Sequence, residues 1–307
     1  MPHNTLPLYA ITVLIWGSTW YAIKLQLGVV APEVSVAYRF ALAAVLLMVW
    51  CTIKGKDMRY AARDHVWMAI QGLFLFSINY AVFYIATGIV TTGLLAVVFS
   101  TIAAWNLLFA RLLFGTPVGG RVLGGAMLGI FGLALVFWPE IEVLGLSGNA
   151  TLGLALCIIA TVLASLGNMT SARNQRRGLP VLQTNAYGMA YGAVFTAVYA
   201  AWTGRAFLWD GSIDYLWSLV YLAVFGSVLG FGAYLTLLGR IGSGRAAYAA
   251  VLFPVVALSL SVLLEGYAFT PLAALGAALV LGGNVLVLAR AKHFSWLHKK
   301  KRAATVQ

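Results

Sequence analysis

The chain has 307 residues, of which 62% are hydrophobic and 9% charged, and it carries a net charge of +12. A soluble fold of this size could not cover its surface with so few charged side chains. Apolar runs of about 20 residues, long enough to cross a ~30 Å hydrocarbon core, recur along the whole length. This composition excludes a soluble domain and predicts an all-α polytopic membrane protein.

The breaks between the apolar runs predict ten transmembrane helices, joined by connectors that are too short to fold as domains. The first run lacks a basic segment and a good cleavage site, so we expect a retained helix and not a signal peptide. In chain order, the predicted spans lie near 6–24, 33–53, 65–86, 91–113, 120–138, 150–172, 180–202, 214–238, 245–264 and 270–290.

The charged residues predict the orientation of the chain. Seventeen of the 20 Lys and Arg side chains fall on the even-numbered connectors or the C-terminal tail, whereas six of the eight acidic side chains fall on the opposite side. The positive-inside rule therefore predicts that both termini are cytoplasmic. Charges spread over short loops in this way serve topology and do not indicate a nucleic-acid partner. We expect the basic tail, 292–307, to lie against anionic lipid headgroups or to be solvated.

Matching positions separated by about half the chain length indicate an internal duplication. The sequence G-A-x-L-x-x-x-G occurs twice, and the matching pairs are Gly125 with Gly276, Gly17 with Gly167, and Pro32 with Pro180. We predict two five-helix repeats, 1–145 and 146–291. Because five is odd, the second repeat enters the membrane from the opposite side. Inverted repeats are common in secondary transporters, which hold their substrate near the bilayer midplane.

Several motifs resemble those of the EamA-type members of the drug/metabolite transporter superfamily, over essentially the whole chain. The motifs are Trp16-Gly17, Pro32 followed by Arg39-Phe40, Phe253-Pro254 and the two G-A-x-L-x-x-x-G runs. Within this superfamily the chain most resembles the YddG aromatic amino-acid exporters. The resemblance implies a ten-helix secondary transporter in the bacterial inner (plasma) membrane. A glutamate that many members carry near the ends of spans 4 and 9 is present here only as Glu265, and Ala103 stands where Pro254 stands in the other half.

Aromatic and small polar side chains near the middle of several spans are candidates for the wall of a substrate cavity. Residues three or four positions apart share a helix face, and the stretch LIWGSTWYAIK, 14–24, places two tryptophans on one face. Aromatic belts belong near span ends, and an unpaired amide facing lipid is costly. Helix packing is the alternative interpretation of each residue. The candidates are Trp16, Ser18, Trp20, Asn79, Tyr80, Phe83, Tyr84, Phe99, Ser100, Trp105, Ser165, Asn168, Met169, Tyr234, Tyr248 and Phe253.

Arg39 is the one clearly intramembrane charge in the predicted spans, about six residues or roughly 9 Å inside the second span. Two interpretations are open, namely contact with the substrate and a structural role such as bonding to exposed carbonyls. Gly17 and Gly88 are candidate bending points. The pairs Gly125-x-x-x-Gly129 and Gly226-x-x-x-Gly230 predict close helix contact, more readily within a monomer than in a dimer.

No Asp, Glu or His falls at the middle of a predicted span. A carrier coupled to protons or sodium usually offers a carboxylate in its pathway. The sequence therefore favours a neutral or zwitterionic solute with hydrophobic surface, which moves down its own gradient or is coupled by a route that the sequence does not reveal. Cys51 and Cys157 are too few for a disulfide framework or a metal site, and we expect neither metal nor cofactor.

The leading hypothesis is a secondary transporter that exports amino acids, aromatic and other hydrophobic ones first, by alternating access around a midplane cavity. Its expected partners are this small-molecule substrate and membrane lipid. A carrier for a sugar, a purine or a drug-like solute is the alternative within the same class. A membrane enzyme would need a clustered polar constellation that the sequence does not offer, and a scaffold would not need an inverted duplication.

Overall fold

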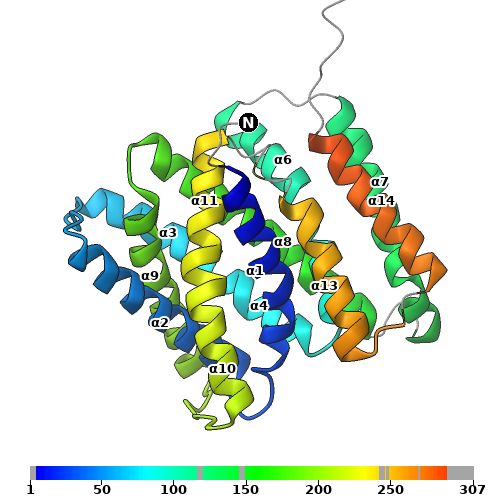
Figure 1. The fold of residues 1–307 in the computed structure, drawn as a ribbon, viewed down its shortest axis with the longest axis horizontal. Helices are drawn as coiled ribbons and strands as arrows, with labels where there is room; N and C mark the ends of the chain where they lie inside the picture. Colours follow the sequence, from blue (N-terminus) through cyan, green and yellow to red (C-terminus); the bar gives the residue numbers. More distant parts are fainter. Residues whose placement is uncertain are drawn as a thin grey trace, which may run out of the picture.

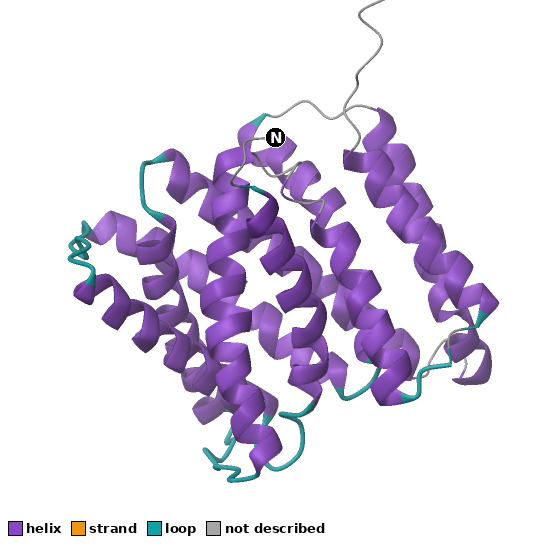
Figure 2. Cartoon of the chain, in the orientation of Figure 1, coloured by secondary structure: helices purple, strands orange, loops and turns teal. Residues whose placement is uncertain are grey.

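In the computed structural model, the described residues are 5–115, 120–144, 149–241, 246, 249–268 and 270–288. This part of the chain is a bundle of helices joined by short loops, with no strand in it (Figure 2). Tyr248 and the basic tail, both singled out from the sequence, lie outside the described residues.

Helices occupy each of the ten predicted spans, with bounds that differ from the prediction by a few residues (Figure 1). In chain order they are α1 (Leu6–Lys24), α2 (Pro32–Ile53), α3 (Ala62–Phe76), α4 (Ile78–Thr87), α5 (Thr92–Ser100), α6 (Ile102–Phe114), α7 (Gly120–Leu144), α8 (Asn149–Arg176), α9 (Val181–Trp202), α10 (Ile213–Tyr221), the π-helix η1 (Leu222–Leu229), α11 (Gly230–Ile241), α13 (Ala249–Glu265) and α14 (Pro271–Leu288).

Three of the predicted spans are interrupted helices. Span 3 divides into α3 and α4 at Ser77, whose φ of −131° and ψ of −91° are not helical, and the Ser77 hydroxyl lies 2.7 Å from that of Thr196. Span 4 divides into α5 and α6 at Thr101, and span 8 contains η1 between α10 and α11. Gly17 lies inside the continuous α1 and Gly88 directly follows α4. Neither glycine interrupts a helix here, so their bending role stays a prediction.

Length and apolar composition identify six of the described helical segments as able to cross a membrane. They are Leu6–Lys24, Pro32–Ile53, Ala62–Thr87, Thr92–Phe114, Thr151–Arg176 and Ile213–Ile241. Shorter apolar helices cover Leu123–Val136, Leu252–Glu265 and Pro271–Leu286. The remaining long helix, α9, carries the polar residues Gln183, Thr184 and Asn185 near its N-terminal end, and all three are buried. These features confirm an all-α polytopic membrane protein.

Polar side chains gather inside the bundle, while many large apolar side chains face outward, as a lipid environment requires. One buried amide network joins three helices. Gln71 of α3 donates to Asn185 of α9 at 3.1 Å and accepts from Asn174 of α8 at 3.0 Å. Because bonded amides are costly to separate in an apolar interior, this network holds α3, α8 and α9 together.

The two G-A-x-L-x-x-x-G runs pack against each other in the α7–α14 pair, on the right of Figure 1. A Cβ on Gly132 would lie 2.7 Å from the carbonyl oxygen of Gly276, and a Cβ on Gly276 would lie 2.6 Å from that of Gly132. The equivalent contact joins Gly283 to the backbone of Gly125 and Gly129. The first glycine of each run thus contacts the last glycine of the other run, as an inverted duplication predicts. The Gly125-x-x-x-Gly129 contact lies within the monomer.

Candidate substrate-binding cavity

A cavity lies at the centre of the bundle, between helices of both predicted halves. Its volume is about 30 Å³, and eight helices contribute to its wall, namely α1, α3, α4, α5 and α6 from the first half and α8, α11 and α13 from the second. The lining residues are Trp16, Thr19, Trp20, Ile23, Leu75, Asn79, Tyr80, Phe83, Phe99, Ile102, Ala164, Asn168, Phe231, Tyr234, Ala250 and Phe253.

Aromatic rings fill most of the space around this cavity. The ring of Trp20 lies edge-on to those of Phe83 and Phe99, with centroid separations of 5.2 and 5.5 Å. The ring of Trp16 lies 5.1 Å from that of Phe231 and 4.8 Å from that of Tyr234. Such edge-to-face arrangements are favourable aromatic contacts. The rings therefore form a continuous apolar wall shared by α1, α4, α5 and α11.

The cavity is too small to hold an amino acid in this conformation. A water molecule needs roughly 10–15 Å³ of such space, so about 30 Å³ admits on the order of two waters. The aromatic rings must separate before an aromatic side chain can enter. The structure thus represents a closed arrangement of the site.

A second polar network lies beside the cavity and centres on Asn106. Its Oδ1 accepts hydrogen bonds from the hydroxyl of Ser165 at 2.8 Å and from Nδ2 of Asn168 at 3.4 Å. Its Nδ2 donates to the hydroxyl of Tyr234 at 3.4 Å. Since all of these residues are buried, Asn106 orients two cavity-lining side chains, Asn168 and Tyr234.

Arg39 lies behind the wall and does not line the cavity. Its side chain is buried, its Nε donates to Ser227 Oγ at 3.0 Å, and its guanidinium carbon lies 4.6 Å from the ring centre of Tyr80. In the described part of the chain, no carboxylate forms an ion pair with it. Gly226 of η1 makes room for this group, because a Cβ there would lie 3.1 Å from the guanidinium. Support of Tyr80 is the interpretation that these contacts favour.

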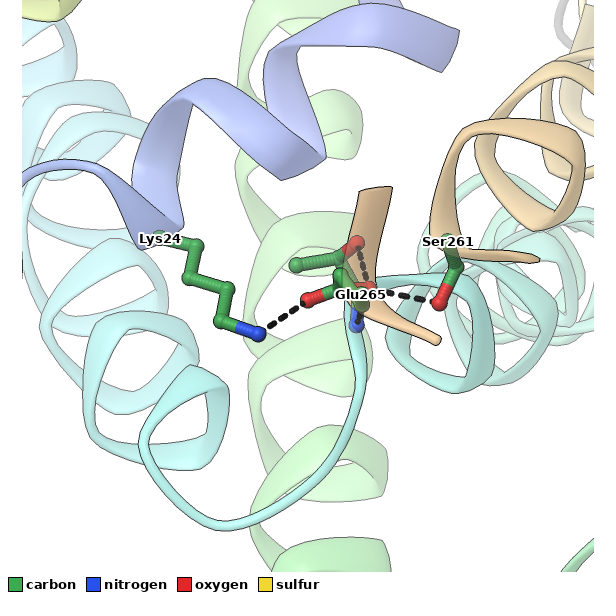
Figure 3. A network of polar contacts seen from close by, with 4 residues as sticks. Lys24, Ser261 and Glu265 are labelled. Carbon is green, nitrogen blue, oxygen red and sulfur yellow. Dashed lines mark hydrogen bonds and ion pairs between the residues drawn. The ribbon is translucent and has the colours of Figure 1, made fainter. Parts of the chain in front are cut away.

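An ion pair and three hydrogen bonds tie helix ends together next to the cavity (Figure 3). Lys24 Nζ lies 2.9 Å from Glu265 Oε1. Glu265 Oε2 accepts from the hydroxyl of Ser261 at 2.5 Å and from the hydroxyl and backbone N–H of Thr92 at 2.7 and 3.1 Å. Because Lys24 follows the cavity-lining Ile23 directly, this cluster of α1, α5 and α13 lies beside the cavity. The orientation predicted from the positive-inside rule would place the cluster on the extracytoplasmic side.

Nine of the candidates chosen from the sequence line the cavity. They are Trp16, Trp20, Asn79, Tyr80, Phe83, Phe99, Asn168, Tyr234 and Phe253. Six others lie elsewhere among the described residues, namely Ser18, Tyr84, Ser100, Trp105, Ser165 and Met169.

The three serines among those six are satisfied by hydrogen bonds away from the cavity. Ser18 contacts the hydroxyl of Tyr221 at 2.6 Å, Ser100 donates to the carbonyl of Val97, and Ser165 donates to Asn106. Hydroxyls in membrane helices readily bond to nearby carbonyls, so their presence in a span does not identify a cavity wall. Ser18 does not line the cavity in this conformation.

The other three residues face different neighbours. The Tyr84 hydroxyl donates to Gln26 at 2.6 Å, and Met169 is buried in the apolar core. Trp105 lines a separate groove of about 280 Å³ between α6 and α7. Trp105 lies about one turn further along α6 than Ile102, which is the residue of α6 that lines the cavity.

Sequence reasoning missed seven lining residues, namely Thr19, Ile23, Leu75, Ile102, Ala164, Phe231 and Ala250. Most of them are ordinary apolar residues that any membrane helix contains. Phe231 could have been found, because it stands three positions before the candidate Tyr234 and so shares its helix face.

The fold defines a class, that of all-α polytopic membrane proteins, and the cavity lies between helices of both predicted halves. A protein-family comparison makes the class specific, since the model described as the EamA-like transporter family matches residues 5–138 and again 151–289. The chain therefore belongs to the EamA-like transporter family, within which it is a multi-pass membrane transporter. The two matches confirm the predicted duplication.

Related proteins agree with this assignment. The chain is 26% identical over 276 residues to the uncharacterized inner membrane transporter YedA of Escherichia coli K12, covering 89% of this chain and 87% of YedA. It is 22% identical to protein PagO of Salmonella typhimurium LT2, covering 86% of each. It is 24% identical to the uncharacterized transporter YoaV of Bacillus subtilis 168, covering 80% and 83%. None of these three names states a substrate.

A protein of known crystal structure has the same fold. The match has a TM-score of 0.69 and covers 92% of this chain and 95% of the other, at 20% sequence identity. At that identity the likeness establishes the fold alone.

Proposed function

We propose that this transporter exports neutral amino acids, aromatic and other hydrophobic ones first, across the inner membrane by alternating access. The observation that carries the proposal is the central cavity, which both halves line and in which Trp, Tyr and Phe make up half of the lining residues. Aromatic faces favour an apolar side chain, and among the described residues no carboxylate, histidine or lysine lines the cavity to select a fully charged solute.

In this proposal, the Lys24–Glu265 pair closes the extracytoplasmic end of the site while substrate enters from the cytoplasm. Outward opening separates α1 from α13 at this pair and lets the aromatic rings part. The breaks at Ser77 and Thr101 lie next to lining segments in spans 3 and 4. They are places where α4 and α5 can tilt without breaking a continuous helix, in keeping with the broken helices of other transporters.

The proposal is tested with purified protein in liposomes and a panel of radiolabelled solutes. Uptake and counterflow are measured for phenylalanine, tryptophan, leucine, threonine, glucose and adenine. We expect phenylalanine, tryptophan and leucine to exchange faster than threonine, with glucose and adenine at the level of empty liposomes. Transport of glucose or adenine without that of amino acids would overturn the proposed substrate class.

A further inference from the structure

Two buried amide oxygens in the cavity wall have no hydrogen-bond donor. Asn79 of α4 and Asn168 of α8 both line the cavity, and each residue is 2% exposed. The Oδ1 atom of each is buried and accepts no hydrogen bond. An unsatisfied buried acceptor costs about 1–3 kcal/mol, and native proteins hold few of them. Two in one cavity indicate that a donor is missing from the site.

The surrounding network determines which end of the Asn168 amide is free. Asn106 Oδ1 already accepts the hydroxyl proton of Ser165, so this atom is an acceptor. In this network the group that Asn168 turns toward it is the Nδ2 donor, at 3.4 Å. A flipped Asn168 amide would place two acceptor oxygens against each other. The network thus leaves the Asn168 oxygen as the group that needs a partner.

Two other polar side chains of the wall are bonded elsewhere, and the hydroxyls of Tyr80 and Tyr234 donate to neither amide oxygen in this conformation. The indole N–H of Trp16 donates to the carbonyl of Gly226 at 3.3 Å. The hydroxyl of Thr19 donates to the carbonyl of Trp16 at 3.0 Å. A molecule in the cavity can therefore supply the donors that the two amide oxygens lack in this conformation.

An ammonium group meets this requirement best. It carries three N–H donors and no acceptor, so it offers a separate hydrogen to each amide oxygen, whereas a hydroxyl has a single hydrogen to donate. Neutral amide oxygens also hold an ammonium group less tightly than a carboxylate does, which suits a site that must release its ligand. Since α4 and α8 belong to different halves, one bound ammonium would link the halves.

We infer that Asn79 and Asn168 form the subsite for the ammonium group of the substrate, with the aromatic wall taking its apolar side chain. This inference rests on the proposed function and deepens it. It defines the substrate as a solute that must carry a primary amine, and not merely as a neutral apolar solute.

The test compares ligands that differ only in the group offered to the two asparagines. Binding to the purified full chain is measured for L-phenylalanine, phenethylamine, L-3-phenyllactate and 3-phenylpropionate. We expect the wild-type chain to bind phenylalanine at least about tenfold more tightly than phenyllactate, because the hydroxyl leaves an acceptor unpaired. Equal binding of phenylalanine, phenyllactate and phenylpropionate would overturn the inference.

Variants locate the effect. Asn79→Leu and Asn168→Leu should each weaken phenylalanine binding about tenfold and leave phenyllactate binding within twofold. Asn79→Asp keeps the side-chain size and should bind phenylalanine at least as tightly as wild type, so it tests the inference even if the leucine variants do not fold. The matched control is Asn185→Leu, a buried asparagine outside the cavity, which should not change the ratio of the two affinities. Equal loss for both ligands would reassign the asparagines to packing.

The outcomes separate this inference from the proposed function. Binding of phenethylamine without binding of phenylalanine would remove the amino-acid substrate and keep the ammonium subsite. Transport of phenylalanine with no preference for the amine would keep the amino-acid substrate and remove the subsite. Binding of none of the amines would remove both.

Discussion

Lys24 Nζ lies 2.9 Å from Glu265 Oε1, and this ion pair connects the end of α1 to the end of α13. The carboxylate side chain is 1% exposed, whereas the lysine side chain is 44% exposed. The Glu265 carboxylate also accepts three hydrogen bonds, from the hydroxyl of Ser261 and from the hydroxyl and backbone N–H of Thr92. The Glu265 side chain is therefore held in place by several bonds, whereas the exposed Lys24 side chain can move away from it. This arrangement is expected of an ion pair that can open and close.

Replacing the Glu265 carboxylate with a neutral amide should weaken the Lys24–Glu265 contact. In Glu265→Gln, the hydroxyl contacts can remain, but the attraction for Lys24 is lost, so we expect the extracytoplasmic end to open more often. The measurement is the labelling rate of Phe83→Cys by an impermeant thiol reagent added from outside, with the native cysteines replaced by alanine. A several-fold faster rate is expected.

The control for this experiment is the other ion pair that the described residues form. Arg205 lies 3.8 Å from Glu33, near α2 and away from the cavity. Arg205→Ala should leave the labelling rate unchanged. A rate that is the same in Glu265→Gln and in the parent chain would show that the pair does not control access.

Truncating the aromatic wall should reduce selectivity for large substrates. Trp20→Ala or Phe83→Ala removes on the order of 50 Å² of apolar contact, worth about 1 kcal/mol or several-fold in affinity. Small solutes such as threonine do not reach these rings, so the ratio of phenylalanine to threonine transport should fall. The ratio is measured in liposomes and normalised to folded protein.

Trp105→Ala is the matched control, because this tryptophan faces the groove between α6 and α7 and not the cavity. This variant should lower neither the ratio of phenylalanine to threonine transport nor the affinity for phenylalanine. If Trp20→Ala and Trp105→Ala behave alike, the rings near the cavity serve packing only.

The glycine contact between α7 and α14 should tolerate no added methyl group. A Cβ at Gly132 or Gly276 would lie within 2.7 Å of a backbone oxygen of the facing helix, which cannot turn aside as a side chain can. We expect Gly132→Ala and Gly276→Ala to destabilise the protein by about 1–3 kcal/mol. Thermal unfolding in detergent measures the effect.

Gly232→Ala provides the comparison, since nothing lies within 4 Å of its Cβ position in α11. Replacement of a helical glycine by alanine should there stabilise by up to about 1 kcal/mol. Equal unfolding temperatures for all three variants would contradict the close contact of α7 and α14.

Transport should not require a proton or sodium gradient. Among the described residues, the two buried carboxylates, Glu33 and Glu265, lie at helix ends and are each paired with a basic side chain. No carboxylate lines the cavity between them. We therefore expect exchange of labelled phenylalanine to persist in liposomes after both gradients are collapsed with ionophores. Accumulation that depends on an imposed proton gradient would refute this expectation.

The positions of the helices followed from the sequence because a bilayer selects segments by local apolar length. The ten predicted spans agree with the helical rods to within a few residues, and the offset of Gly125 and Gly276 revealed the duplication that the family comparison confirms. Mid-span Trp and Asn residues also pointed to a cavity, because such side chains are costly against lipid. These are properties that a short window of sequence carries.

The tertiary structure decided which faces meet. Trp20 and Trp105 both lie within predicted spans, yet one lines the cavity and the other a separate groove. Rotation of a helix about its axis depends on all of its neighbours, and these helices are apolar on every side, so the pattern alone does not indicate the inward face. For the same reason, the pairing of Lys24 with Glu265, and the two amide oxygens left without donors, arise only when both halves are assembled.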